Sequence, residues 1–474
     1  MKSIGLKTTT TMPKPSFTYL PRWALVLGLT LAPWAGRAAE TSPQSSFYLK
    51  DGDHVCFYGD SITEQRFYGL DVETYVRTRF PNLRVRFVNS GVGGDRVTGG
   101  WAGAIDLRLA RDVFPFKPNV VTIMLGMNDA SYRAFDQKIF DVYTNGYEHI
   151  IQSLQAHLPG VRIVLIEPSP YDDVTESPKF AGGYNGVLLR YAAFVRQLAS
   201  EHGLPCIDLN RPLVKVMEKA QANHPRLAHD VIPGRVHPSA AGELVMAQGI
   251  LQAWNAPAMV TSVTLDTAAD NAVQAVNTTV SQVKTSHGIL SWKQQDRCLP
   301  FPILALHDDW PQFPPVQNGG MSMFWGAPRL RWNYTNPGTA MIVRYSGFYH
   351  ALDRQPLRVT GLTDGTYELK INGRPVAKLS AEQLGRGINL ALYRTPMLEQ
   401  SYQVLRLAWE QVQWRYFAWR GIQLPMSIDH DPAVRQAERA LIAALRMQKE
   451  GIVEQQYAAA RPAPTFYELL PTGD

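Results

Sequence analysis

The sequence predicts an α/β protein: a parallel sheet covered by helices, followed by a smaller β-rich region and a C-terminal helix. Three observations support this. Residues 47–256 alternate short β-branched runs with amphipathic segments, residues 258–425 consist mainly of short apolar runs between turn signals, and residues 431–459 are charged and rich in alanine. Because 474 residues exceed what one core usually organises, we expect more than one domain.

Five runs in the first region are strand candidates, and several are apolar at successive positions, as strands covered on both faces must be. They are His54–Gly59, Val85–Asn89, Val120–Leu125, Arg162–Glu167 and Pro205–Leu209. Helix-like stretches lie around 66–79, 137–157, 184–202 and 239–254. Strands alternating with helices imply right-handed crossovers and a parallel sheet, in which chemistry gathers beyond the carboxyl ends of the strands.

The region 258–425 is expected to form a second, β-rich domain. Its strand candidates are Ser262–Leu265, Met341–Tyr345, Leu357–Val359 and Tyr367–Ile371. The dipeptides Asp364-Gly365 and Asn372-Gly373 are typical of hairpin turns. A helical segment is expected near 396–416, and residues 431–474 are expected to form a helical tail that ends in a proline-containing stretch.

Residues 1–39 have the pattern of an export signal that is removed from the mature protein. The segment carries five basic residues and no acids. Four of the five precede the apolar run Trp23–Leu31, and small residues follow at 35–39. A retained anchor is the alternative, but the apolar run is too short to span a bilayer comfortably and no later run approaches that length. We therefore expect an exported protein, periplasmic or secreted, without an integral membrane segment.

The charge balance gives no reason to expect nucleic acid as a partner. The formal net charge falls from +6 to +1 once the five basic residues of the leader are removed. The basic character therefore belongs to the leader, and neither nucleic acid nor an anionic membrane follows from it.

Cysteines and histidines do not indicate a disulfide framework or a metal site. The three cysteines, Cys56, Cys206 and Cys298, are odd in number and widely spaced. His224 and His229 stand five residues apart beside Asp230, but a third convincing ligand is missing. No metal is expected.

A serine follows the first predicted strand, in Gly59-Asp60-Ser61-Ile62-Thr63-Glu64. On such a turn a serine can expose its hydroxyl and its backbone N–H together, and acyl transfer needs both a nucleophile and a donor for the oxyanion. The structural alternative is that Ser61 simply caps a helix.

Two further turns follow the second and third predicted strands. Asn89–Asp95 is rich in glycine, which lets backbone N–H groups approach a ligand. A dinucleotide fingerprint fails there because Arg96 stands at the third glycine position. Gly126-Met127-Asn128-Asp129 can aim an amide N–H at developing negative charge, although asparagine and aspartate are also ordinary turn residues.

A histidine precedes the last predicted helix of the first region, in Arg235-Val236-His237-Pro238-Ser239. Its place at a loop-to-helix junction, fixed by the following proline, suits a general base. The order of the four segments resembles the four sequence blocks of the SGNH/GDSL hydrolase family over residues 50–256.

This resemblance implies a flavodoxin-like three-layer α/β/α fold and serine-based ester hydrolysis without a cofactor. By position, Ser61 would be the nucleophile and His237 the base. The N–H groups of Ser61 and Gly94 and the side chain of Asn128 would form the oxyanion hole.

The sequence departs from the family pattern at Gly234, where members usually carry an aspartate three residues before the histidine. Asp230 is the nearest acid upstream, and Glu243 lies about one helical turn downstream. Three readings remain open: a backbone carbonyl orients His237 and leaves a Ser–His dyad, Asp230 substitutes, or the enzyme is crippled. Loss of the acid in a serine triad can cost about 10⁴ in kcat without abolishing catalysis.

Parts of residues 341–425 resemble the C-terminal region of a bacterial subgroup of these hydrolases, through Gln355–Leu362, Gly387–Ala391 and Thr395–Met397. Before them, Trp310–Pro337 gathers Phe313, Phe324, Trp325, Trp332 and Tyr334, which suit either an interface between domains or sugar stacking.

We therefore expect a serine esterase for acyl esters, chiefly acetyl, on small molecules or polysaccharides. The alternatives are a non-catalytic carbohydrate-binding protein on a hydrolase fold and a lipase or phospholipid acyl hydrolase. Oligomeric state is not predicted.

Overall fold

The computed structural model describes residues 46–269, 272–303, 337–426 and 431–472. The predicted leader 1–39 and the aromatic residues of 310–336 lie outside these ranges. Residues from Ser46 onward form one compact unit, so their division into separate domains stays a prediction. None of the helices within the described ranges combines the length and the apolar character needed to cross a bilayer.

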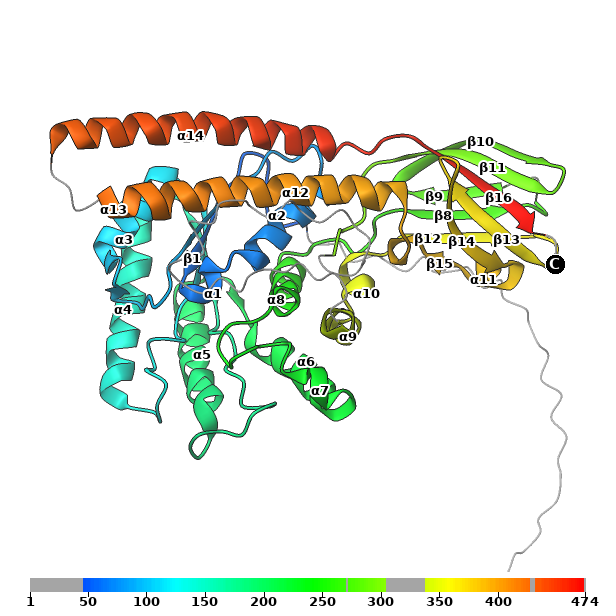
Figure 1. The fold of residues 1–474 in the computed structure, drawn as a ribbon. Helices are drawn as coiled ribbons and strands as arrows, with labels where there is room; N and C mark the ends of the chain where they lie inside the picture. The colour runs from blue at the N-terminus through cyan, green and yellow to red at the C-terminus, as the bar shows by residue number, and fades with distance from the viewer. Residues whose placement is uncertain (1–45, 270–271, 304–336, 427–430, 473–474) are drawn as a thin grey trace, which may run out of the picture. The chain divides into compact units, whose positions relative to one another are not determined.

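A five-stranded, fully parallel sheet organises the first part of the chain (Figure 1). Its strand order is β2-β1-β5-β6-β7. The strands are β1 (His54–Gly59), β2 (Arg86–Gly91), β5 (Val120–Met124), β6 (Arg162–Ile166) and β7 (Cys206–Ile207). The predicted parallel α/β sheet is confirmed, although the last strand is shorter than the predicted Pro205–Leu209.

Helices cover both faces of this sheet, with α2 and α8 packed together on one face and α4 and α5 on the other (Figure 1). The helices are α1 (Ser61–Glu64), α2 (Phe67–Arg79), α3 (Ile105–Asp112), α4 (Gln137–His157), α5 (Gly183–Glu201), α6 (Asn210–Asn223), α7 (Pro225–Ala228) and α8 (Ala240–Ala253). A short 3₁₀ turn, η1 (Phe114–Phe116), and the two-residue strands β3 (Gly99–Gly100) and β4 (Gly103–Ala104) complete the region.

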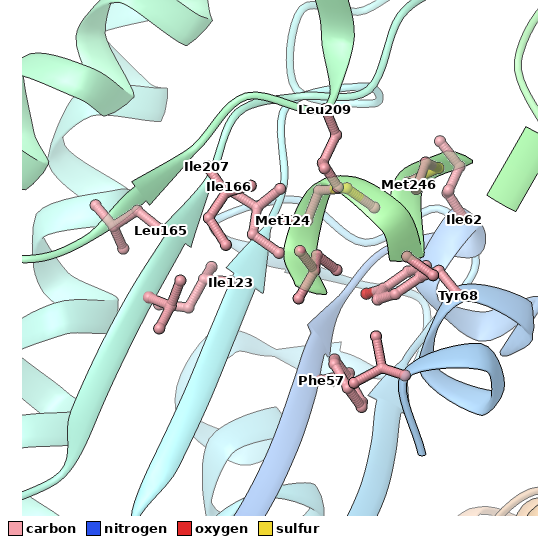
Figure 2. Packing of buried hydrophobic residues seen from close by; sticks show 14 of the residues in the cluster. Phe57, Ile62, Tyr68, Ile123, Met124, Leu165, Ile166, Ile207, Leu209 and Met246 are labelled. Atoms are coloured by element: carbon pink, nitrogen blue, oxygen red, sulfur yellow. The ribbon is translucent and has the colours of Figure 1, made fainter. Parts of the chain in front are cut away.

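The core is built from the apolar runs of the strands and the inner faces of the helices. Strand residues such as Phe57, Ile123 and Ile166 are fully buried. Figure 2 shows Met246 of α8 near Ile62 and Tyr68, which follow β1. These buried contacts fix the start of α1, where the candidate nucleophile lies.

Two further sheets share a second core. One is antiparallel, in the order β10-β11-β16-β13-β14, and the other has the order β15-β12-β8-β9. Their strands are β8 (Ser262–Asp266), β9 (Ala272–Val276), β10 (Thr278–Ser286), β11 (Ile289–Asp296), β12 (Pro356–Thr360), β13 (Thr366–Ile371), β14 (Arg374–Ser380), β15 (Ile388–Asn389) and β16 (Thr465–Thr472). The core combines residues of both sheets, among them Leu265, Trp292, Leu357 and Leu369. The short elements α11 (Ala381–Arg386) and η3 (Leu390–Leu392) lie between strands.

The strand prediction for Met341–Tyr345 is wrong. These residues lie in helix α9 (Pro337–Ser346), which is followed by α10 (Phe348–Leu352). Met341, Ile342 and Val343 are buried in the core of the parallel sheet and not in the β-rich core. A short apolar run has no periodicity that separates a strand from a buried helix, and tertiary packing decided here.

Two long helices follow: α12 (Pro396–Phe417), close to the predicted 396–416, and α14 (Pro432–Ala459). Leu398 and Leu405 of α12 share a cluster with Phe67 and Leu70 of α2, so α12 packs on the first region. It continues into a π-helical turn, η4 (Ala418–Gln423), and α13 (Leu424–Met426). The tail prediction is wrong for residues 465–472, which form β16 between β11 and β13.

Candidate functional site

The segments singled out in the sequence meet beyond the carboxyl ends of the parallel strands. Ser61 begins α1 directly after β1, the glycine turn follows β2, Asn128 follows β5, and His237 precedes α8. Because parallel strands end at the same edge of a sheet, segments far apart in the sequence become neighbours.

Ser61 and His237 are hydrogen-bonded: Nε2 of the imidazole lies 2.8 Å from the hydroxyl oxygen Oγ of Ser61. The cap of α1 is Asp60, whose carboxylate accepts a hydrogen bond from the N–H of Ile62 at 3.0 Å. Ser61 is therefore not the helix cap, and its hydroxyl is available to the histidine. Burial raises the pKa of Asp60 to about 8.

The loop that carries His237 is held at both ends. The side chain of Gln65 donates to the carbonyl of Pro238 at 3.2 Å, which ties the loop to the end of α1. Ser239 caps α8 and accepts from the N–H of Gly242 at 3.1 Å. Partial desolvation lowers the pKa of His237 from its ordinary value of 6.5, and the charge of Glu64 acts in the opposite direction. A neutral imidazole at neutral pH is what a general base requires.

The backbone donors predicted for an oxyanion hole are unoccupied. Within the described ranges, the N–H groups of Ser61 and Gly94 have no hydrogen-bond acceptor in the protein. Gly94 has a φ of +78°, a conformation that glycine adopts without strain. The neighbouring N–H of Gly93 is different, since it donates to the carboxylate of Glu64 at 2.5 Å. Gly94 is therefore the residue of this turn with a free donor.

The amide of Asn128 is oriented from both sides. Its Nδ2 donates to the carbonyl of Asp95 at 3.1 Å, and its Oδ1 accepts from the hydroxyl of Tyr132 at 3.0 Å. The second hydrogen of Nδ2 remains for another acceptor. The structure thus brings Ser61, Gly94, Asn128 and His237 to one edge of the sheet.

A buried ion-pair network supports the glycine turn from below. Arg108 contacts Asp95 at 2.7 Å, pairs with Asp112, and donates to the carbonyl of Ser90 at 2.8 Å. Burial raises the pKa of Asp95 to about 6, and Arg108 opposes this rise. Burial likewise raises the pKa of Asp129 to about 7, while its carboxylate accepts from the N–H of Val97.

The acids considered for the missing family aspartate are engaged elsewhere. A carboxylate oxygen of Asp230 lies 3.4 Å from Nε2 of the neighbouring His229, a contact that is an ion pair only when this histidine is protonated. Glu243 is fully buried in α8 and accepts from the N–H of Tyr68 at 2.8 Å. Within the described part of the chain, neither carboxylate is hydrogen-bonded to His237, and Nδ1 of its ring has no hydrogen-bond partner. Gly234 adopts a φ of +69°, a conformation that strains residues other than glycine, although the space where a Cβ would stand is open.

Two exposed aromatic side chains flank the oxyanion donors, and the sequence reasoning did not single them out. Trp101 is 51% exposed and its indole N–H donates to the carbonyl of Gly93 at 2.7 Å. Tyr132 is 45% exposed and contacts Asn128 as described above. Arg420 of η4 lies 4.1 Å from the ring of Trp101. The local sequence around Trp101 and Tyr132 has no pattern that marks them as site residues, because their place in the site depends on contacts between segments distant in the sequence.

The charge of Glu64 was also missed as a feature of the site, although the residue stands inside the quoted motif. Its carboxylate accepts from Gly93 and from the hydroxyl of Tyr416 at 2.9 Å. Tyr416 belongs to α12, and a contact across this sequence distance leaves no local pattern. In the described ranges, the structure shows no group of three or more His, Cys, Asp or Glu side chains suited to a metal ion.

Comparison with known proteins places this geometry in a family context. Residues 57–244 match the model of the GDSL-like lipase/acylhydrolase family. An acetylxylan esterase from Geobacillus stearothermophilus is 28% identical over 224 residues, which cover 43% of this chain and 94% of that protein. A GDSL esterase/lipase from Arabidopsis thaliana is 29% identical over 177 residues, or 33% of this chain and 69% of that protein.

A solved structure resembles the fold over most of the chain. The structure of a gut microbial diltiazem-metabolizing enzyme superposes with a TM-score of 0.73 and covers 90% of this chain and 100% of its own, at 23% identity. The likeness therefore extends beyond the parallel sheet to the β-rich part.

Proposed function

Because residues 57–244 belong to the GDSL-like lipase/acylhydrolase family and the chain is a carboxylic ester hydrolase, we propose that it removes short acyl groups from carbohydrates through a serine acyl-enzyme. The observation that carries the mechanism is the 2.8 Å hydrogen bond between His237 and Ser61. It puts a base that is neutral at neutral pH on the hydroxyl that must lose its proton.

In the proposed acylation step, Nε2 of His237 takes the proton of Ser61 as Oγ attacks the ester carbonyl. The carbonyl oxygen becomes an oxyanion that accepts from the free N–H groups of Ser61 and Gly94 and from the amide of Asn128. When the tetrahedral intermediate collapses, His237 returns the proton to the leaving alcohol. Water then attacks the acyl-enzyme, with His237 again taking and returning the proton.

Two observations favour a carbohydrate as the alcohol part of the ester. Trp101 and Tyr132 present exposed rings beside the proposed oxyanion donors, and flat rings offer contact area at little entropic cost. The similarity to an acetylxylan esterase points in the same direction.

A panel of esters tests this proposal. We expect the chain to hydrolyse p-nitrophenyl acetate and acetylated xylo-oligosaccharides faster than p-nitrophenyl octanoate, and Ser61→Ala to lose about 10³-fold or more in kcat. A preference for octanoyl esters would indicate a lipase. Equal rates for Ser61→Ala and the parent would remove the serine mechanism, and binding of acetylated polysaccharide without turnover would indicate a binding protein.

We further propose that residues 1–39 direct export. Expression with the full leader followed by N-terminal sequencing of the mature protein tests this, and an intact N-terminus would contradict removal of the leader.

A further inference from the structure

His237 lacks the carboxylate that usually accompanies such a histidine, and the inference that follows rests on the proposed serine mechanism. Gly234 cannot supply a charge, Asp230 lies beside His229, and Glu243 accepts from the N–H of Tyr68 through Oε2. The imidazolium that forms during each proton transfer still needs stabilisation.

Glu64 lies where it can provide this charge. Ser61 and Glu64 are the first and last residues of α1, three positions apart, so their side chains share one side of the helical turn. A Cβ built on Gly93 would lie 2.9 Å from Oε2 of Glu64 and 3.7 Å from Cβ of Ser61. The carboxylate and the nucleophile therefore flank the same glycine.

The carboxylate is fixed by two donors from different parts of the chain. Oε2 accepts from the N–H of Gly93 at 2.5 Å, and Oε1 accepts from the hydroxyl of Tyr416 at 2.9 Å. The Tyr416 ring in turn carries the guanidinium of Arg66 4.0 Å from its centre. Hydrogen bonds to an ionised acceptor are among the stronger ones, so the carboxylate is held in place.

We propose that Glu64 is a positioning residue that takes over the electrostatic role of the absent aspartate: it stabilises the protonated form of His237 and, through Gly93, holds the turn that presents the N–H of Gly94. In this arrangement α12 is part of the active site, because Tyr416 holds the carboxylate in place.

The charges around these groups agree with this role. Glu64 is the charged group that acts on His237, where it raises the pKa against the larger effect of desolvation. Burial and the neighbouring Glu64 raise the pKa of Tyr416 to about 12, so its hydroxyl remains a donor. The charges of Arg66 and Arg420 act on Tyr416 and lower its pKa, against the larger effect of burial. The charge of Glu64 also contributes to raising the pKa of Asp95.

The decisive experiment is a pH profile of kcat/KM for p-nitrophenyl acetate with Glu64→Gln in the full chain. We expect kcat to fall about tenfold with KM within about twofold, because the imidazolium is stabilised only as the proton moves. We also expect the acid limb of the profile to move to lower pH, because His237 loses the negative charge of Glu64 that favours its protonated form. A merely structural role would lower activity without moving this limb.

Two further variants separate charge from shape. Adding Gly234→Asp to Glu64→Gln restores a carboxylate at the family position, and we expect it to recover about half or more of the lost kcat on a logarithmic scale. Tyr416→Phe keeps the charge of Glu64 but removes one of the hydrogen bonds that hold its carboxylate, and should lower kcat about two- to fivefold. Glu410→Gln, which removes a partly exposed acid of the same helix paired with Arg406, should leave kcat and the acid limb unchanged.

The outcomes distinguish this inference from the proposed function. If Ser61→Ala is inactive while Glu64→Gln, folded by circular dichroism, matches the parent in kcat and in its acid limb, Glu64 has no such role. A fall in kcat with an unmoved limb and no recovery by Gly234→Asp would also overturn it. If Ser61→Ala stays active, the serine mechanism itself is wrong.

Discussion

Arg108 lies with no solvent exposure beneath the glycine turn, and its removal is a direct test of the ion-pair network there. The guanidinium pairs with Asp95 at 2.7 Å and with Asp112, and donates to the carbonyl of Ser90. Asp112 keeps further donors, Arg111 and Trp419, when Arg108 is removed. Asp95 keeps no other cation within hydrogen-bonding distance in the described ranges, and one of its oxygens already has no partner.

Arg108→Met should therefore leave one buried carboxylate uncompensated, together with a carbonyl that has lost its donor. Breaking a buried pair on one side costs about 3–5 kcal/mol, a large part of the stability of a typical protein. The free energy of unfolding, measured by urea titration at pH 7.5, should fall by this amount. Arg406→Met removes a partly exposed arginine paired with Glu410 and should cost less than about 0.5 kcal/mol.

The loss should also depend on pH. The folded pKa of Asp95 is about 6, above its ordinary value of 3.8, so the folded state binds more protons than the unfolded state between these values. Without Arg108 the folded pKa rises further, and protonation relieves the buried charge as the pH falls. The difference between Arg108→Met and the parent should hence be smaller at pH 5 than at pH 7.5. A loss below about 1 kcal/mol, or one equal at both pH values, would refute this reasoning.

Three further outcomes follow from the site. A Cβ on Gly91 would lie 2.4 Å from the backbone nitrogen of Glu64, so Gly91→Ala should displace α1. The free energy of unfolding from urea titrations should fall by about 1–3 kcal/mol. The control Gly186→Ala has open space in α5 and should not lower this free energy. Activity should rise with pH through the lowered pKa of His237, so the acid limb of the parent's kcat/KM profile should lie below 6.5, and a limb above that value would contradict its assignment as base. Trp101→Ala should raise KM about three- to tenfold for acetylated xylo-oligosaccharides and much less for p-nitrophenyl acetate, and equal effects on both would argue against sugar stacking.

The parallel sheet and the edge that carries the site could be predicted because both depend on short patterns in the sequence, namely apolar strand runs that alternate with helices. The predicted strand His54–Gly59 has the same bounds as β1, and the predicted Val120–Leu125 ends one residue after β5. Buried parallel strands are apolar at successive positions, which makes them recognisable in the sequence. Once strand and helix alternate, the carboxyl ends of the strands meet at one edge, and the meeting of Ser61 with His237 follows.

The parts that could not be predicted depend on packing between distant segments. Met341–Tyr345 is as apolar as a strand, and only its place against the first core decides that it is helical. Thr465–Thr472 contains a proline and follows a long helix, yet it fills the gap between β11 and β13. The sequence showed that the family aspartate is missing at Gly234. It did not single out Glu64 as the carboxylate that we propose in its place, because no local pattern connects Tyr416 with Glu64.

The last of these contacts changes how the C-terminal part of the chain should be regarded. Helix α12 packs on α2, donates from Tyr416 to Glu64, and leads into a turn whose Trp419 donates to Asp112 and whose Arg420 lies on Trp101. These contacts reach the end of α1, the support of the glycine turn and the rim of the site. An accessory module that only carried the enzyme to its substrate would not need them. Helix α12 is therefore a structural part of the proposed active site, and π-helical turns such as η4, into which it leads, are frequent at functional positions.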